Sequence, residues 1–177
     1  MYVLKLQTKQ DIIARYNNGE KLEFVFFWGG YLSNWFESCF EIEGVTYFCV
    51  EQYMMAMKAK TFNDTITLEK IMKSNDPKVV KQLGREVRNY DDTIWSKERL
   101  KVVYDGNYAK FSQNESLRNY ILHTKDKVLV EASPFDAIWG VKLNKESPLI
   151  KNPNNWLGEN YLGFTLMAVR EELKKVV

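Results

Sequence analysis

Glu51 and Lys58 are the first residues along the chain whose types and spacing could do chemistry. They lie in the run 50–59, which lacks glycine and proline and is rich in methionine and alanine, so it predicts a helix buried on most sides. Positions 51, 55 and 58 share one face of such a helix, which places a carboxylate and an amine on the same stripe. Burying either charge is costly without a partner. Two interpretations are open: a structural ion pair, or an acid and an amine held for a reaction.

A second chemically rich segment is the loop 131–140, which follows a short buried strand predicted at 128–130. It carries Glu131, Asp136 and Trp139 together with a proline and a glycine, more polar and aromatic character than a plain connection needs. Asp136 is a candidate for chemistry. It could equally cap a short helix that begins at Ala137, because aspartate often fills that position.

The composition limits the class of protein. The 177 residues predict one domain over 1–177, and a net charge of +2 gives no polybasic surface for tight non-specific binding of nucleic acid. With one histidine and two cysteines, Cys39 and Cys49, neither a zinc site nor a cysteine–histidine nucleophile can be assembled, so no metal and no cofactor is predicted. No apolar run suits a signal peptide or a membrane span, so we expect a soluble cytoplasmic protein. Aromatic residues reach 14%, which predicts that some rings line a pocket.

The remaining patterns predict the elements that must position these residues. Helices are expected over 8–18, 64–73, 77–84, 94–111, from 114 and from 157 to the C-terminal end, with caps at Asn63 or Asp64, at 74–77, at Thr93 and at Asn114. Strands are expected over 23–28 and in a hairpin whose turn is Glu43-Gly44. The segment 145–155 is polar and predicts a surface connection. The fold class is therefore α+β, mostly helical, with a small antiparallel sheet.

Several motifs occur in one order along the chain. They are Phe27 with Leu32-Ser33-Asn34-Trp35, Glu51-Gln52-Tyr53, Lys58-Ala59, Leu83-Gly84-Arg85, Trp95, Lys110-Phe111-x-Gln113-Asn114, Leu129-Val130-Glu131-Ala132-Ser133-Pro134-x-Asp136-x-x-Trp139-Gly140, and Trp156-x-Gly158-x-Asn160-x-Leu162-Gly163-x-x-Leu166-Met167-x-x-Arg170. This series resembles the NADAR or YbiA-like family over residues 24–170. The resemblance implies a compact, mostly helical α+β fold and N-glycosidase chemistry on the bond between a ribose C1 and a base nitrogen.

The resemblance implies two substrate classes, and nothing in the composition separates them. Some members resemble hydrolases of phosphorylated ribosylamino-pyrimidine intermediates of riboflavin synthesis. Others are similar to enzymes that remove ADP-ribose from guanine bases in nucleic acid. The sequence departs from the family pattern at Lys142, where a second glycine is usual, and at Trp35, where phenylalanine is commoner. A side chain at position 142 restricts the backbone of that loop.

Cleavage of an N-glycosidic bond builds positive charge on the ribose while electrons move into the leaving base. We predict Glu51 and Asp136 as the acid pair that divides this work, with the two roles unassigned between them. Lys58 could lower the pKa of Glu51, bind phosphate or react as an amine. Trp95, Trp139 and Trp28 are candidates for stacking on the base, against core packing as the alternative. Candidate contacts to ribose or phosphate, with loop braces and surface ion pairs as their alternatives, are Asn34, Arg85, Lys110 and Asn160.

The sequence therefore predicts a metal-independent N-glycosidase. Its expected partner is a ribosylated nucleotide or an ADP-ribose-bearing substrate, including ADP-ribosylated nucleic acid, and no membrane. A non-catalytic module that binds ADP-ribose or a related nucleotide is the alternative, motivated by Lys142. The true substrate and the oligomeric state do not follow from the sequence.

Overall fold

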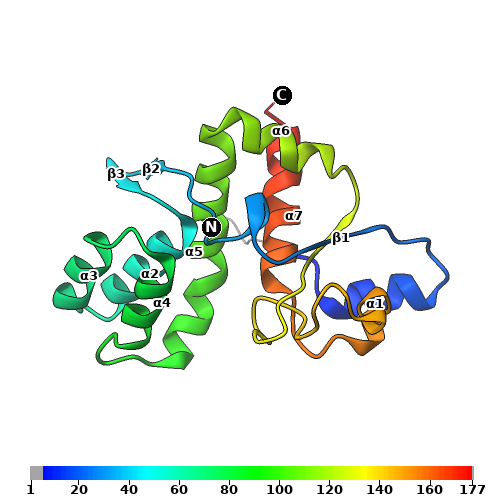
Figure 1. Ribbon diagram of the computed structural model, residues 1–177, viewed down its shortest axis with the longest axis horizontal. Coiled ribbons are helices and arrows are strands. Elements are labelled where there is room, and N and C mark those ends of the chain that lie inside the picture. Colours follow the sequence, from blue (N-terminus) through cyan, green and yellow to red (C-terminus); the bar gives the residue numbers. More distant parts are fainter. Residues whose placement is uncertain (1–5, 177) are drawn as a thin grey trace. The chain divides into compact units, whose positions relative to one another are not determined.

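A computed structural model describes residues 6–176, and these residues form two compact units. Unit 1 comprises the described residues of Met1–Ser33 and Asn119–Val177, and unit 2 is Asn34–Arg118. Unit 1 contains α1 (Lys9–Asn17), β1 (Phe24–Phe27), the 3-10 turn η1 (Gly30–Leu32), β4 (Val128–Glu131), η2 (Pro148–Lys151), η3 (Pro153–Asn155) and α7 (Tyr161–Lys174) (Figure 1). Unit 2 contains β2 (Phe40–Ile42), β3 (Val45–Tyr47), α2 (Val50–Thr61), α3 (Thr65–Met72), α4 (Pro77–Arg85) and α5 (Asp92–Gln113), and α6 (Glu115–His123) crosses the boundary. The predicted single domain over 1–177 stays a prediction.

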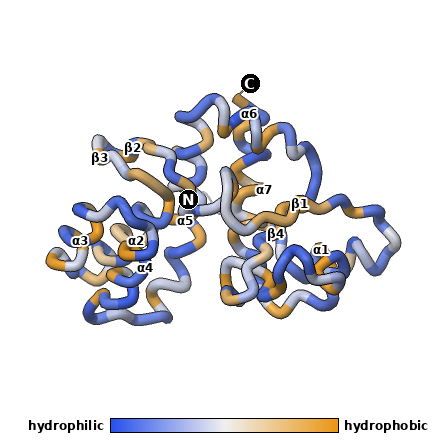
Figure 2. Tube along the Cα trace, in the orientation of Figure 1, coloured by the Kyte–Doolittle hydropathy of each residue, from blue (hydrophilic) through white to orange (hydrophobic). Residues whose placement is uncertain are grey.

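Unit 1 is built on a pair of parallel strands. β1 pairs with β4 in a register that places Phe24 opposite Val128 and Phe27 opposite Glu131. Figure 2 colours β1 as hydrophobic along its length, as expected of a strand that faces a core. The sequence predicted both strands but not their pairing, because a parallel partner about a hundred positions away leaves no local signal.

Helix α7 packs closely on β4 in unit 1. A Cβ added at Gly163 would lie 2.0 Å from the carbonyl oxygen of Leu129, so only glycine permits this approach. The sequence predicted this helix from residue 157, whereas it begins at Tyr161 after Asn160 in the left-handed conformation. Its start is set by Asn160, whose side chain is described below.

Unit 2 is organised around α2, which packs against α3, α4 and α5. The prediction of a helix buried on most sides is confirmed, since residues 50–56 and Ala59 are buried. Two glycines allow the neighbouring helices to approach. A Cβ at Gly84 would lie 1.9 Å from the sulfur of Met55, and one at Gly106 would lie 2.8 Å from the ring of Tyr53. Gly84 therefore packs against α2 and does not end α4, which continues to Arg85.

The hairpin and most helix caps agree with the sequence. β2 and β3 are antiparallel, and the turn residues Glu43 and Gly44 have φ values of 53° and 75°, as a tight two-residue hairpin requires. Asp64 caps α3, and Asp76 caps α4 with proline at its first position. The cap of α5 is Asp91 rather than Thr93, because the Asp91 carboxylate accepts the backbone N–H of Thr93 and the helix starts two residues earlier than predicted.

The segment 145–155 is largely exposed, as expected of a surface connection, but two of its residues are part of the core. Ile150 and Pro153 are buried inside η2 and η3, and the Trp156 indole donates to the Ile150 carbonyl at 2.8 Å. The prediction of a polar surface segment therefore describes most of these residues, and it missed two buried apolar positions spaced three apart among polar neighbours. Within residues 6–176, no helix is both long and apolar enough to cross a bilayer.

The contact between Gly163 and β4 can be tested by Gly163→Ala. The added methyl group would collide with the backbone of Leu129, so we expect a loss of about 1–3 kcal/mol or more in the free energy of unfolding. Urea denaturation followed by circular dichroism measures it. Glu171→Ala, on an exposed position of the same helix, should change stability by less than about 1 kcal/mol. Equal stabilities of parent and Gly163→Ala would contradict this packing.

Candidate active site

Glu51 lies in the first turn of α2, and its side chain is only 3% exposed. The backbone N–H of Glu51 donates to the carbonyl of Asn34 at 2.9 Å, which fixes the start of the helix to the loop that follows η1. A carboxylate at this end of a helix is stabilised by the unpaired N–H groups of the first turn. Burial raises the pKa of the neighbouring Cys49 thiol to about 12, so that thiol is protonated near neutral pH.

Asn34 is held in turn by a residue that the sequence analysis did not single out. The Asn107 amide donates to the Asn34 side-chain oxygen at 3.0 Å and to the carbonyl of Val103 at 2.9 Å. Both asparagines are buried, at 6% and 0% exposure. The signal in the sequence was an asparagine on the apolar face of the helix predicted over 94–111. The structure therefore brings together Asn34 and Glu51, with Asn107 as their support.

The Lys58 ammonium group lies at the C-terminal end of α4. It donates to the carbonyl of Gly84 at 2.7 Å and lies 4.1 Å from the centre of the Tyr90 ring. Burial lowers the pKa of Lys58, and the charges of Asp92 and Glu51 oppose this shift. Arg85 follows Gly84 directly and is exposed. The Lys58 ammonium therefore lies at the end of a helix whose last turn contains Arg85, where the last carbonyl groups favour positive charge.

Trp95 and Lys110 lie in the interior of unit 2. Their exposed fractions are 5% and 0%, so both are core residues in this structure. Trp95 therefore packs in the core, which the sequence had left open as an alternative to stacking on the base. The Lys110 amine lies 5.0 Å from the ring centre of Phe111 and 5.5 Å from that of Phe36, and burial lowers the pKa of Lys110 to about 7. Contact of either residue with substrate stays a prediction.

Asp136, in unit 1, caps the turn that follows it. One carboxylate oxygen accepts the backbone N–H groups of Ile138 at 2.9 Å and of Trp139 at 2.8 Å. The capping alternative is therefore observed, although the turn does not continue as a helix. A cap engages one oxygen, so the carboxylate keeps a second oxygen for other chemistry.

The loop that carries Asp136 is tied along its length to the segment that enters α7. Backbone N–H groups of Glu159 and Leu162 donate to the carbonyls of Ala137 and Trp139, and those of Leu157 and Asn160 donate to Val141 and Gly140. A Cβ at Gly158 would lie 2.1 Å from the Gly140 carbonyl oxygen, so the two segments touch backbone to backbone. The loop is therefore held as part of the fold.

Asn160 braces β4 through its side-chain amide. It is fully buried, with a φ of 55°, and its amide bridges β4 by accepting from the N–H of Glu131 and donating to the carbonyl of Leu129, both at 2.9 Å. The predicted contact with ribose or phosphate stays a prediction, and the structure shows each end of the amide bonded to β4. The alternative role as a loop brace is the one observed.

Trp28 and Trp139 lie on segments that follow β1 and β4. Trp28 is 59% exposed, and Trp139 is half-buried next to the Asp136 cap. A ring that sequence reasoning missed, Phe135, is 82% exposed and lies beside Trp28, with 6.1 Å between ring centres. The only sequence signal for it was its position directly before Asp136.

Lys142 adopts the backbone conformation that glycine favours. Its φ is 57°, in the left-handed region that costs an ordinary residue about 1–2 kcal/mol. The backbone at Lys142 therefore has the conformation that the glycine usual at this position in the family would adopt. Trp35, the other departure, has the Lys81 amine 5.5 Å from its ring centre.

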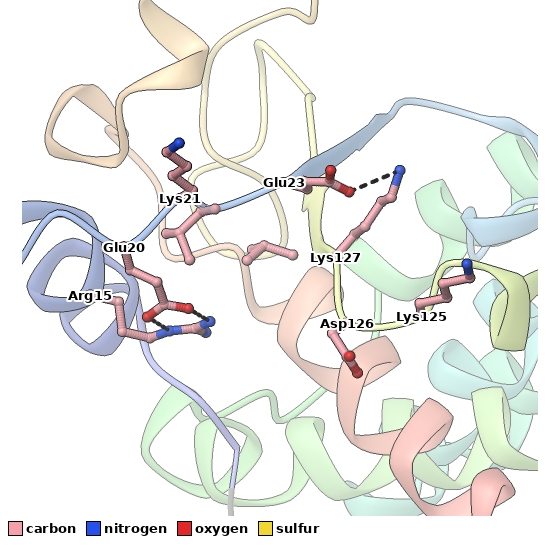
Figure 3. Close-up of a pocket in the computed structure, with 9 residues that line it drawn as sticks. Arg15, Glu20, Lys21, Glu23, Lys125, Asp126 and Lys127 are labelled. Atoms are coloured by element: carbon pink, nitrogen blue, oxygen red, sulfur yellow. Dashed lines mark hydrogen bonds and ion pairs between the residues drawn. The ribbon is translucent and has the colours of Figure 1, made fainter.

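A cavity of about 290 Å³ in unit 1 contains none of the predicted site residues (Figure 3). It lies where β1 and β4 begin, whereas the Asp136 loop follows their other ends. Its charged side chains are largely paired: Arg15 with Glu20, Lys127 with Glu23, and Asp126 with Lys174. Among residues 6–176, no group of three histidine, cysteine, aspartate or glutamate side chains is placed to hold a metal ion.

These features define a small, mostly helical α+β protein with a buried acid at a helix start and a second acid on a braced loop. The NADAR domain model matches residues 26–174, and the chain belongs to the NADAR family. A protein of Acanthamoeba polyphaga mimivirus named as an N-glycosidase is 41% identical, with 85% of this chain and 96% of that protein covered. A protein of Vibrio vulnificus (strain YJ016) named as a riboflavin biosynthesis protein is 31% identical over 82% of this chain and 36% of its own length.

A solved structure has the same fold. The NMR structure of the E. coli protein YbiA matches with a TM-score of 0.70 and 26% sequence identity, covering 87% of this chain and 86% of that chain. The predicted fold class and family are therefore confirmed. The names of the relatives support N-glycosidase activity in general, and no substrate follows from them.

The brace at Asn160 predicts a large effect of Asn160→Gly. Glycine keeps the left-handed backbone but leaves the N–H of Glu131 and the carbonyl of Leu129 without their partner, so we expect a loss of about 2–4 kcal/mol in the free energy of unfolding. Asn63 is a matched control, because it is exposed and has a φ of 54°. Asn63→Gly should be neutral or slightly stabilising. Similar losses in both variants, measured by urea denaturation, would show that the amide bridge is unimportant.

The buried amine of Lys110 predicts a pH-dependent stability. Its folded-state pKa of about 7 lies below the ordinary 10.5, so between these values the unfolded chain binds more protons at this site. The contribution of Lys110 to stability therefore rises with pH across this window. Lys110→Met should be most advantageous relative to the parent below pH 7, and this advantage should shrink toward pH 10. The exposed Lys97→Met on the same helix should show a flat difference in thermal unfolding over the same range.

Proposed function

We propose that this protein is an N-glycosidase that hydrolyses the bond between a ribose C1 and a base nitrogen. Its substrate is ADP-ribosylated guanine in nucleic acid or a phosphorylated ribosylamino-pyrimidine intermediate of riboflavin synthesis. The observation that carries the proposal is the burial of Glu51, a residue that is only 3% exposed in the first turn of α2. The names of the mimivirus and Vibrio relatives support the same type of reaction.

A buried carboxylate suits the charge that this reaction develops. As the bond to the base breaks, positive charge spreads over the ribose ring, and a negative group shielded from water stabilises it more strongly than an exposed one. The same carboxylate can instead hold the attacking water. Asn34 and Asn107 fix the helix start and so limit the movement of Glu51.

Asp136 is assigned to the same reaction as the second acid. One of its oxygens is held by two backbone N–H groups, so the orientation of the carboxylate is fixed and its other oxygen serves in proton transfer or in holding water. The roles of Glu51 and Asp136 are left unassigned between them. Lys58, which donates to the Gly84 carbonyl near the end of α4, and Arg85, the last residue of α4, are assigned to phosphate oxygens of the substrate.

The alternative of a non-catalytic nucleotide-binding module rested on Lys142. With a φ of 57°, Lys142 keeps the conformation that a glycine would adopt, so this departure gives no reason to expect a lost activity. No other observation favours that alternative.

Glu51→Gln and Asp136→Asn test the acid pair. Each keeps the size of the side chain, and the amide oxygen of asparagine can still accept the N–H groups of Ile138 and Trp139, so both variants should fold. We expect turnover to fall by about 10²–10⁴-fold in each. The assay incubates each protein with a ribosylamino-pyrimidine phosphate and with an oligonucleotide carrying ADP-ribosylated guanine, and detects the released base by mass spectrometry.

Glu69→Gln, an exposed acid on α3, is the matched control and should retain full turnover. If both acid variants cleave every substrate at the parental rate, Glu51 and Asp136 are not the catalytic acid pair. Substrate binding without base release by the parent protein would favour the non-catalytic module. If both acids serve one reaction, the double variant should lose much less than the product of the two single losses.

A further inference from the structure

A cavity of about 290 Å³ lies in unit 1 where β1 and β4 begin (Figure 3). Pockets that hold small molecules start at about 300 Å³, so the volume suits a ligand of modest size. Leu22 and Val128 supply the apolar lining. The other lining residues are charged and belong to α1, to the segment 20–23 and to the turn 125–127. A ligand for this cavity therefore has a short apolar part and a charge.

The charges of the lining do not cancel. Each acid of the described lining has a cationic partner, in the ion pairs Arg15–Glu20, Lys127–Glu23 and Lys174–Asp126. Within residues 6–176, by contrast, the ammonium groups of Lys21 and Lys125 have no ion-pair or hydrogen-bond partner. Figure 3 shows Lys21 on the side of the Arg15–Glu20 pair and Lys125 on the side of Lys127. Two positive charges therefore remain for a ligand from outside the chain.

Lys125 is kept at a cost to the backbone. Its φ is 51°, in the left-handed region that costs an ordinary residue about 1–2 kcal/mol. The N–H of Lys125 donates to the carbonyl of Leu122 at 3.0 Å, in the kind of turn that ends a helix and usually contains glycine. Because the ammonium group contacts no partner in the described chain, the lysine adds a charge to the cavity and no contact to the fold.

The walls of the cavity are held by the rest of unit 1. The N–H of Val128 donates to the carbonyl of Glu23 at 2.8 Å, which joins the starts of the two strands. The buried guanidinium of Arg170, on α7, donates to the Thr124 hydroxyl and to the carbonyl of Lys127, both at 2.9 Å. The turn that follows α6 is therefore fixed at both ends, so little conformational freedom is lost when a ligand binds.

We propose that this cavity binds a small organic dianion, either a phosphate monoester or a dicarboxylate, with a short apolar body. Two uncompensated ammonium groups match two negative charges, and a phosphate monoester carries about −1.5 to −2 near neutral pH. The apolar body packs on Leu22 and Val128. The Asp136 loop follows the other ends of β1 and β4, and none of the residues assigned to the reaction lines the cavity. The inference therefore does not rest on the proposed function.

The test titrates the protein with phenyl phosphate at pH 8 and follows the backbone amide resonances by NMR. We expect saturable shifts at residues 20–23 and 125–128. Phenyl sulfate has the same shape with a single charge, and inorganic phosphate has the charge without the ring. Each should bind about 10-fold more weakly, because it lacks either the second charge or the apolar contact. Phthalate, an aromatic dicarboxylate, shows which of the two kinds of dianion binds more tightly.

Lys125→Gly removes one charge and suits the left-handed backbone. We expect binding of phenyl phosphate to weaken about 10-fold while stability is unchanged or slightly raised, so a binding loss cannot be due to unfolding. Lys142→Gly is the matched control, because Lys142 is exposed, has a φ of 57° and does not line the cavity. It should have the same effect on stability and keep parental binding. Lys21→Met should weaken binding by a similar factor.

Three results would overturn the inference. They are shifts confined to residues outside the lining, parental affinity in both Lys125→Gly and Lys21→Met, and equal affinity for phenyl phosphate and phenyl sulfate. The absence of saturation below about 10 mM phenyl phosphate would also overturn it and would show that the two lysines are solvated surface charges. Turnover is not a readout in this test, so a protein that cleaves no N-glycoside would refute the proposed function and leave the cavity result in place.

Discussion

The amide of Asn160 is the interaction on which the arrangement of unit 1 depends. A side chain that both accepts from Glu131 and donates to Leu129 joins the end of β4 to the start of α7. That bridge is made from the left-handed conformation, which asparagine tolerates better than most residues. The backbone hydrogen bonds between 137–141 and 157–162 then follow, because the two segments leave the bridge side by side. These hydrogen bonds hold the loop that carries Asp136 and so fix the position of this residue.

In unit 2, the carboxylate of Glu51 lies inside an apolar cluster of helices and has to be stabilised there. Glu51 occupies the first turn of α2, where the helix itself supplies favourable electrostatics. The buried amide pair of Asn34 and Asn107 holds that turn from outside the helix. Hydrogen-bonded amides suit this position because they are polar without adding a charge that would need its own partner.

Local patterns in the sequence predicted most elements and several caps. The buried α2, the Glu43-Gly44 turn and the caps at Asp64 and Asp76 each depend on neighbouring residues, so their signals are contained in a short window. The pairing of β1 with β4 and the bridge of Asn160 depend on residues far apart in the chain, and sequence patterns carry no register for them. The burial of Ile150 and Pro153 was missed for a related reason, since polar and exposed neighbours dominate the local pattern.

For the candidate site, too, the sequence predicted some features and missed others. Residue type and family resemblance selected Glu51 and Asp136, but they could not distinguish residues that touch substrate from residues that hold the site. Asn160 and Lys110 illustrate the difficulty, because an asparagine or a lysine in a family motif suits either role until its hydrogen bonds and burial are seen. Phe135 shows the converse error. A lone phenylalanine in a loop is usually taken for packing, and only its 82% exposure beside Trp28 reveals a ring directed outward. Chemistry-bearing residue types are therefore recognisable from sequence, whereas the division between contact and support follows from burial.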